Sequence, residues 1–164
     1  KSDIIVCGLH TLYSDKISDL VDIKIFMDTD RELIKKWKIT RDIDKRGYSM
    51  EKILKQIESR KNDYDNYIKI QKENADIIIN FYETENGNVK CNMIMKNKCH
   101  IEKLHKIESL YDTDSDDIMK IKLKGYVDEK MKSILSKKID INDLKINDGY
   151  YGEIQMILIL LLYK

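Results

Sequence analysis

Charged side chains are concentrated in the stretch "WKITRDIDKRGYS" at positions 37–49, which contains Lys38, Arg41, Asp42, Lys45 and Arg46. Arginine keeps its charge at all physiological pH values and presents a planar fork of donors, which suits it to phosphate oxygens. Gly47 follows directly and lets the chain turn where other residues would resist. The stretch therefore predicts a mobile clamp on phosphate. A solvated helix face is the alternative that the charge pattern leaves open.

These cationic residues need a helix to position them, and the surrounding sequence predicts one from about residue 30 to 46. Thr29 and Glu32 have the spacing of a capping box, and Gly47 can end the helix. Apolar residues recur at intervals of three and four, so the cationic residues fall on a different face. Ser49 can cap a second, longer helix that continues to Ala75.

Composition limits the function classes. The chain has 164 residues, of which 42% are hydrophobic, which is enough for a globular core. Because 30 Lys and Arg balance 29 Asp and Glu, no long-range field attracts nucleic acid or a membrane. The longest apolar run, at 156–163, is too short to span a membrane and predicts a buried helix or strand. Three unpaired cysteines indicate free thiols in a reducing compartment, so we expect a cytoplasmic protein.

Element order in the first half of the chain favours an α/β fold. Apolar runs at 3–8, 23–27 and 76–82 have the composition of buried parallel strands, and helical segments separate them. We therefore expect these three runs to lie parallel in one sheet. The helix at 30–46 is expected to project from that sheet.

The second half predicts mixed α and β structure. Turn-forming residues at 84–88 suggest a boundary. Beyond them, "VKCNMIMKNK" and "IMKIKLKGYV" alternate like strands of a half-exposed sheet, with the acidic loop "DTDSDD" between them. A helix is expected at "DEKMKSILSKK", before the final apolar run.

Five blocks between residues 4 and 83 carry a family resemblance: "CGLHTLYSD", "IKIFMDTD", "WKITRDIDKRGYS", "ESRKNDYDNYI" and "IQKENADIII". In order and approximate spacing they resemble the phosphoribulokinase and uridine kinase family of P-loop kinases, and they look closer to phosphoribulokinases. In the tail, "DGYYGEI" resembles the end of the plant and cyanobacterial type. The resemblance implies the C-terminal half of a P-loop kinase-like core, with its lid, over residues 1–83. Residues 84–164 would be an α+β extension.

The activity implied by the resemblance is ATP-dependent phosphoryl transfer, with Mg²⁺, to a hydroxyl of a sugar phosphate or nucleoside. Lys38, Arg41 and Arg46 fall on the family's lid, where cations contact nucleotide and sugar phosphates. Asp42 falls on an acidic position that the resemblance places near the reaction centre, so Arg41 and Asp42 are the catalytic candidates. An equal alternative is that Asp42 holds Arg46 or Lys38 in place.

Four further residues are implied as substrate contacts. His10 and Tyr13 match the strand end that faces the acceptor sugar, and Arg60 and Lys61 match a basic pair on the long helix. Without the resemblance, His10 could equally be a loop histidine with a structural role, and Arg60 and Lys61 could lie on a solvated helix face. We predict no metal-binding cluster in this chain.

Two departures from the family pattern concern ATP and Mg²⁺. The sequence contains no G-x-x-x-x-G-K-[ST] loop, whose backbone and lysine cradle phosphates. In the family, that loop and the general-base aspartate precede the "GLH" strand. Cys7 stands where the family has a glutamate, and a thiol is a poor ligand for Mg²⁺.

Two hypotheses follow from this pattern. In the first, the chain is part of a kinase, and a preceding segment or a partner chain supplies the P-loop. In the second, it is a non-catalytic binding or structural module that descends from such a kinase. Expected partners are a small phosphorylated substrate and, for a homo-oligomer, another copy of the chain. Neither nucleic acid nor a membrane is expected.

Overall fold

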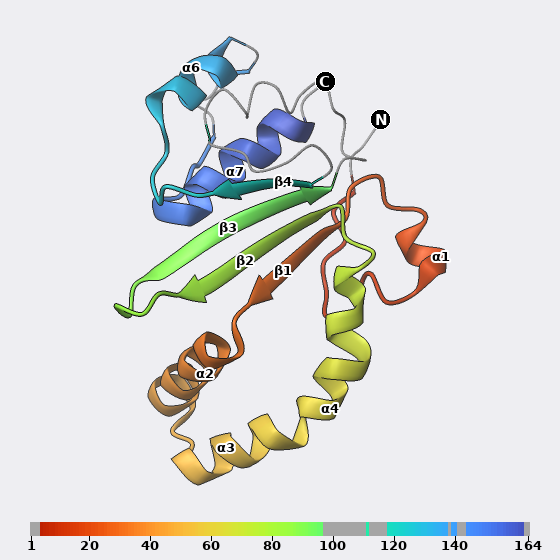
Figure 1. Cartoon of the computed structure of the whole chain (residues 1–164), viewed down its shortest axis with the longest axis vertical. Coiled ribbons are helices and arrows are strands. Elements are labelled where there is room, and N and C mark those ends of the chain that lie inside the picture. Colours follow the sequence, from red (N-terminus) through yellow and green to blue (C-terminus); the bar gives the residue numbers. More distant parts are fainter. Residues whose placement is uncertain (1–3, 97–110, 112–117, 138, 141–143, 163–164) are drawn as a thin grey trace. The chain divides into compact units, whose positions relative to one another are not determined.

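Four strands form one sheet in the order β1-β2-β3-β4. The strands are β1 (Ile25–Thr29), β2 (Ile77–Glu83), β3 (Val89–Lys96) and β4 (Ile118–Lys122). This computed structural model describes residues 4–96, 111, 118–137, 139–140 and 144–162 (Figure 1). The chain divides within β2 into two compact units, Lys1–Ile78 and Ile79–Lys164. We call them the N-terminal and C-terminal units. The mixture of helices with a sheet confirms the predicted α/β class.

The first strand pair is the one that the sequence predicts at 23–27 and 76–82. The backbone N–H groups of Asp76 and Ile77 donate to the carbonyl oxygen of Lys24, at 2.9 and 3.0 Å. These contacts join the start of β1 to the start of β2, and the two strands are hydrogen-bonded neighbours in the sheet, so they run in the same direction. The predicted parallel pairing is confirmed.

The strand predicted at 3–8 is wrong. Residues 4–7 have no regular structure and residues 8–13 form turns, while Ile4 and Ile5 are 85% and 93% exposed. A buried parallel strand needs hydrogen-bonded neighbours. Among the described residues, the sheet provides no strand beside this run. A short helix, α1 (Asp15–Ser18), follows it.

Helix α2 (Arg31–Arg46) confirms the helix predicted at 30–46. Its N-cap is Asp30, whose side chain makes no capping hydrogen bond, so the predicted capping box is wrong. Gly47 ends the helix at φ 62°, a left-handed conformation that glycine adopts without a Cβ clash. The N–H groups of Gly47 and Tyr48 donate to the carbonyl oxygens of Ile43 and Asp42, which satisfies the last turn.

The second helical run begins as predicted and then changes form. In α3 (Met50–Ser59), the side chain of Ser49 accepts a hydrogen bond from the Lys52 N–H at 3.3 Å, which confirms its capping role. The run continues as α4 (Lys61–Asp63), a π-helical turn η1 (Tyr64–Ile68) and a 3-10 turn η2 (Lys69–Lys72). The expectation of one regular helix to Ala75 is therefore wrong, although the helical path is correct. Departures of this kind from α-helical spacing often occur at functional sites.

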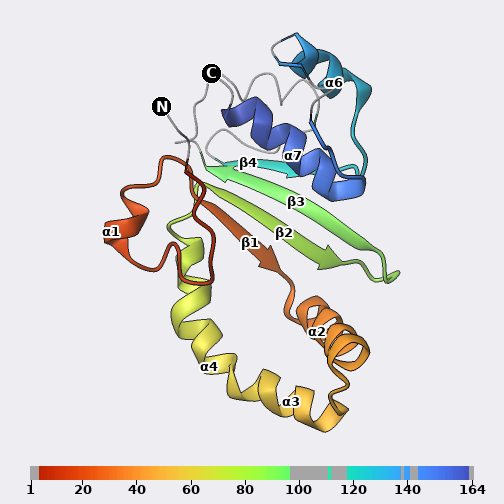
Figure 2. The ribbon, with the colours of Figure 1, turned by 180° about the vertical axis from the view of Figure 1, so that it is seen from behind.

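The C-terminal unit is built on the antiparallel pair β3 and β4, in which Met93 lies opposite Ile121. Their side chains alternate between buried and exposed, as the sequence predicts. A tight turn joins β2 to β3, with Gly87 at φ 78°. The helices described in this unit are α6 (Glu129–Ser136) and α7 (Gly149–Leu162), and both lie on the same side of β3 and β4 (Figures 1 and 2). The predicted acidic loop at 112–117 lies outside the described residues.

Helix α7 contains the final apolar run and buries one carboxylate. Glu153 is fully buried and accepts hydrogen bonds from the Tyr111 hydroxyl at 2.6 Å and from the N–H groups of Lys124 and Gly125 at 3.0 and 2.8 Å. The neighbouring Gly152 has no room for a side chain, since a Cβ there would lie 1.8 Å from the Asn147 carbonyl oxygen. The "YYGEI" motif is therefore explained by packing in this unit. In the part of the chain that the structure describes, no helix meets the length and apolarity of a membrane span.

Candidate functional site

Four of the predicted site residues come together on α2, and we call them the lid cluster: Lys38, Arg41, Asp42 and Arg46. Asp42 is fully buried at the centre. Its Oδ2 lies 2.7 Å from Lys38 Nζ, and its Oδ1 lies 2.9 Å from Arg41 Nε and 3.2 Å from Arg46 Nη1. Residues four apart share a helix face, so the spacing of Lys38, Asp42 and Arg46 brings their side chains together.

The lid cluster carries excess positive charge. Hydrogen bonds from Arg41 and then from Lys38 lower the pKa of Asp42 from 3.8 to about 2, so this carboxylate is ionised at neutral pH. It compensates one of three positive charges. The side chains of Arg41 and Arg46 are 50% and 49% exposed, whereas that of Lys38 is 16% exposed. The cluster therefore presents two guanidinium groups to solvent around a buried anion, an arrangement that suits an anionic ligand.

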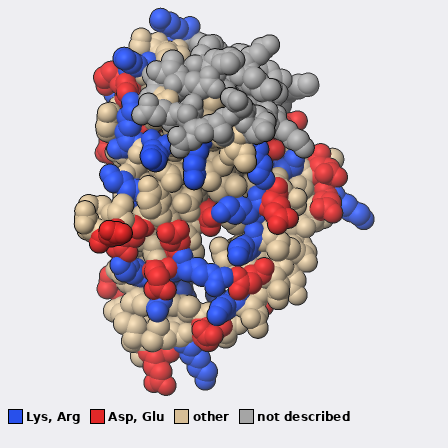
Figure 3. Space-filling model, viewed as in Figure 1, with Lys and Arg blue, Asp and Glu red and all other residues tan. Residues whose placement is uncertain are grey.

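This concentration of positive charge is local. Figure 3 shows Lys and Arg interspersed with Asp and Glu on the face that it presents, in agreement with the balanced composition. Ligand recognition by the lid cluster therefore depends on geometry more than on the field of the whole chain.

His10 and Tyr13 lie together on the turns at 8–13, which we call the acceptor loop. Both side chains are exposed, and their ring centroids are 6.2 Å apart at nearly a right angle. The Tyr13 ring also lies 5.7 Å from the ring of Tyr67 in the π-helical turn. The loop thus packs against η1 through aromatic rings.

A buried side chain, Gln71, ties the acceptor loop to the helical run. Its Oε1 accepts from the Leu12 N–H at 3.0 Å, and its Nε2 donates to the carbonyl oxygens of Leu9 at 3.0 Å and Tyr67 at 2.6 Å. Asn74 adds a donor bond to the Leu12 carbonyl oxygen at 3.1 Å. Sequence reasoning assigned Gln71 no role, although "QK" before Ala-Asp was one of the motifs behind the resemblance.

Two residues that follow Gln71 contact β1, one near each end of the strand. Lys72 Nζ forms an ion pair with Asp28 at the end of the strand, and Asp76 Oδ2 accepts from the Lys24 N–H at 2.9 Å before its start. The segment "QKENAD" at 71–76 therefore joins the acceptor loop, β1 and the start of β2 within the N-terminal unit.

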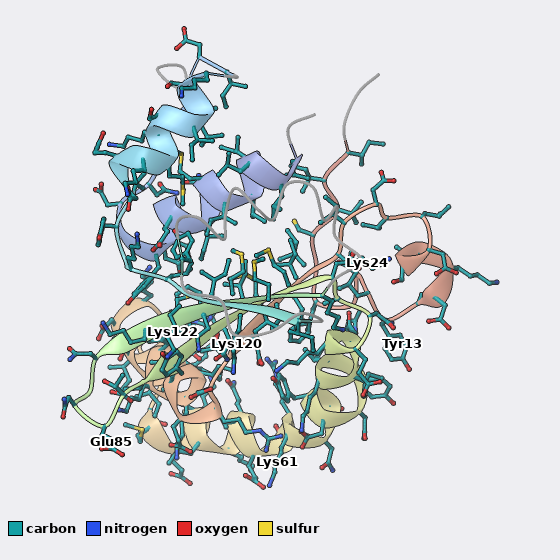
Figure 4. All side chains as sticks on the ribbon, turned by 45° about the horizontal axis from the view of Figure 1, so that its top comes forward. Tyr13, Lys24, Lys61, Glu85, Lys120 and Lys122 are labelled. Carbon is teal, nitrogen blue, oxygen red and sulfur yellow. The ribbon has the colours of Figure 1, made fainter. Side chains whose placement is uncertain are left out.

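Arg60 and Lys61 belong to neither group. They lie exposed where α3 meets α4, and Arg60 departs from helical geometry at φ −98° and ψ 1°. Figure 4 shows Lys61 well separated from Tyr13. The described contacts therefore group six of the eight predicted site residues in two places, the lid cluster and the acceptor loop.

Comparison with known proteins identifies the family. Residues 1–87 match the family described as "Phosphoribulokinase / Uridine kinase family". The chain belongs to this family. The chloroplastic phosphoribulokinase of Spinacia oleracea is 43% identical over 82 residues, which make up 50% of this chain and 20% of that enzyme. Uridine-cytidine kinase A of Dictyostelium discoideum is 44% identical over 77 residues, which make up 46% of this chain and 15% of that protein.

A solved structure extends the likeness of fold beyond the matched half. The phosphoribulokinase from Rhodobacter spheroides aligns with a TM-score of 0.54 and 22% sequence identity, over 76% of this chain and 50% of that one. The fold of this family member is thus that of a P-loop kinase, and its similarity is closer to phosphoribulokinases than to uridine kinases. The chain spans about a fifth of the length of the spinach enzyme that it matches.

The family implies ATP, and the residues of this chain fit only part of an ATP and Mg²⁺ site. The lid cluster offers donors for phosphate oxygens. The P-loop motif does not occur in the sequence, and no cluster of three His, Cys, Asp or Glu side chains suited to a metal is found among the described residues. Cys7, at the position where the resemblance implies a glutamate, is an exposed free thiol. The described part of the chain therefore does not fit the Mg²⁺ ion.

Proposed function

We propose that this chain supplies the lid and the acceptor side of a kinase that transfers the phosphoryl group of ATP to a hydroxyl of a sugar phosphate or nucleoside. The observation that carries the proposal is the convergence of Lys38, Arg41 and Arg46 on the buried Asp42. Family membership supports a kinase in general. Because the P-loop motif does not occur in this sequence, the proposal requires a P-loop from another segment or a partner chain.

In this proposal, the two arginines of the lid cluster contact phosphate oxygens. Arg41 uses its Nε for Asp42, and Arg46 uses one Nη, so both guanidinium groups retain further N–H donors. Cations placed in this way stabilise the charge that develops on a migrating phosphoryl group. Lys38, the least exposed of the three cations, adds positive charge on the other carboxylate oxygen of Asp42.

Asp42 acts in the proposal by positioning these cations. A carboxylate whose pKa is lowered to about 2 accepts a proton poorly at neutral pH, because an efficient general base has a pKa near the working pH. Its burial among three cations supports the same role. The alternative from the resemblance, a place at the reaction centre, is supported by sequence position alone.

The acceptor loop is the proposed site for the hydroxyl-bearing substrate. His10 and Tyr13 are exposed side chains that can donate and accept hydrogen bonds with sugar hydroxyls. Arg60 and Lys61 remain proposed contacts on the strength of the resemblance. A cytoplasmic location and a homo-oligomer remain expectations from the sequence.

A second candidate is a non-catalytic module that binds phosphorylated ligands without turnover. Cys7 and the missing P-loop motif favour it. The two candidates are separated on the full-length protein, with the segment or partner chain that supplies the P-loop present. An assay for ADP release with ATP, Mg²⁺ and either ribulose 5-phosphate or uridine is combined with calorimetric titration of each acceptor. ADP release that depends on the acceptor supports the kinase. Acceptor binding without ADP release supports the module, and the absence of both contradicts the proposed function.

A further inference from the structure

Gln71 is one of the few buried polar residues of the described chain, with an exposed fraction of 3%. It lies in η2, directly after the π-helical turn, and makes three hydrogen bonds through one amide group. Two of them cross to the acceptor loop, over sequence separations of 59 and 62 residues. A buried amide without partners is costly, so a site with all three bonds satisfied keeps the side chain in one orientation.

The bonds reach the acceptor loop at the residue before each of its two predicted substrate contacts. Leu9 precedes His10, and Leu12 precedes Tyr13. Gln71 donates to the carbonyl oxygen of Leu9 and accepts from the N–H of Leu12, so one side chain holds the backbone directly before His10 and directly before Tyr13. The loop's own bonds, from Thr11 Oγ1 to the Gly8 carbonyl and from the Tyr13 N–H to the His10 carbonyl, shape its turns without attaching it to another element.

We propose that Gln71 is a positioning residue for the acceptor: it sets the location of His10 and Tyr13 by fastening the acceptor loop to the π-helical turn. The inference rests on the proposed function for the role of these two residues. The third bond of Gln71 goes to the carbonyl oxygen of Tyr67, whose ring lies tilted against the Tyr13 ring with the centroids 5.7 Å apart. The backbone of the acceptor loop and the ring of Tyr13 are therefore both held by the segment that contains Tyr67 and Gln71.

The first test asks whether Gln71 holds the loop, without any ligand. In the full chain, amide hydrogen exchange at Leu12 is compared between wild type and Gln71→Leu, with Asn66→Leu as the matched control. Asn66 is an exposed amide residue in the same helical run. We expect exchange at Leu12 to be at least about tenfold faster in Gln71→Leu, as a locally opened bond requires, while Ile79 in β2 is unchanged. Unchanged exchange at Leu12 overturns the inference.

The second test asks whether the hydrogen bonds of Gln71 to the acceptor loop contribute to the binding of the acceptor substrate. Affinities for ribulose 5-phosphate and for ATP are measured by calorimetry on the same proteins. We expect Gln71→Leu to weaken ribulose 5-phosphate binding by about tenfold or more and ATP binding by less than about twofold, because only the acceptor loop is released. A loss that is equal for both ligands would mean general destabilisation and overturns the inference.

A second variant covers the case in which Gln71→Leu does not fold. Gln71→Glu keeps the size and the acceptor for the Leu12 N–H but cannot donate to the Leu9 and Tyr67 carbonyls. It is expected to protect the Leu12 amide and still lose affinity for ribulose 5-phosphate. Wild-type affinity in Gln71→Glu overturns the inference and leaves the proposed function standing. Failure of the wild type to bind either ligand contradicts the proposed function, and the inference with it, whatever the exchange at Leu12.

Discussion

Two fully buried carboxylates, Asp42 in the N-terminal unit and Glu153 in the C-terminal unit, are stabilised in different ways. Within the described residues, the hydrogen bonds that Glu153 accepts come from neutral donors, a tyrosine hydroxyl and two backbone N–H groups. Asp42 is surrounded by three cationic side chains, two of them half exposed. The first arrangement fixes a turn within a packed core, and the second holds positive charge at a surface.

The difference distinguishes a structural polar group from a polar group that is proposed to bind a ligand. The donors to Glu153 are the backbone N–H groups of Lys124 and Gly125 and the hydroxyl of the buried Tyr111. Their positions are fixed by the fold, and each is directed at the carboxylate of Glu153. Burial and then hydrogen bonding to Glu153 raise the pKa of Tyr111, which keeps its hydroxyl a donor. The arginines of the lid cluster can bind Asp42 and a phosphate together, because each guanidinium has five N–H donors.

The largest effect is predicted for Glu153→Leu. It leaves three donors unpaired in the C-terminal unit, and each costs roughly 1–3 kcal/mol. The free energy of unfolding should therefore fall by at least about 3 kcal/mol, as measured by urea denaturation. Glu129→Gln, at an exposed carboxylate on α6, is the control and should stay within about 0.5 kcal/mol. If Glu153→Leu changed the free energy of unfolding by as little as the control does, Glu153 would not have the structural role assigned to it here.

A smaller loss of stability is predicted for Asp42→Asn. The amide still accepts a hydrogen bond, and Arg41 and Arg46 can turn to water because they are half exposed. The urea midpoint should therefore shift by less than in Glu153→Leu. An equal or larger shift would mean that Asp42 supports the fold of the N-terminal unit as strongly as Glu153 supports its own. The distinction between the two carboxylates would then be lost.

The contribution of Asp42 to stability should depend on pH with a defined sign. Its pKa is lowered on folding from 3.8 to about 2, so its stabilisation is complete above 3.8 and is lost as pH falls towards 2. The difference in unfolding free energy between wild type and Asp42→Asn should be constant above about pH 5 and should shrink below 3.8. Other acids titrate in both proteins and cancel in the difference. A difference that grows on acidification would contradict the ion pairing of Asp42.

Local sequence signals predicted the elements that position the site. Gly47 and the spacing of apolar residues gave the end and the course of α2, and Ser49 gave the start of α3. The resemblance then placed the cationic residues on the lid. These local signals could not predict contacts between residues far apart in the sequence. The burial of Asp42 depends on where its three partners point, and helix geometry alone shows only that they share a face.

The failures also have long-range causes. An apolar run such as 3–8 predicts a buried strand only if neighbouring strands are present, and the pattern of one run carries no information about its neighbours. The irregular turns at 64–72 accompany the bonds of Gln71 to residues about 60 positions earlier in the chain. No local pattern predicts such bonds, which is why the role of Gln71 was missed.

Calorimetric titration of Arg46→Lys with ATP and with ribulose 5-phosphate tests the central claim, that the lid cluster binds phosphate through its guanidinium geometry. Lys keeps the charge but cannot reproduce the planar fork, so the affinity should fall by roughly 1–3 kcal/mol, the worth of a hydrogen bond to a charged group. Lys45→Gln, at an exposed cation of the same helix outside the cluster, should stay within about 0.5 kcal/mol of wild type. Equal affinities of wild type and Arg46→Lys would contradict the claim, and an equally large effect of Lys45→Gln would reduce it to general charge attraction.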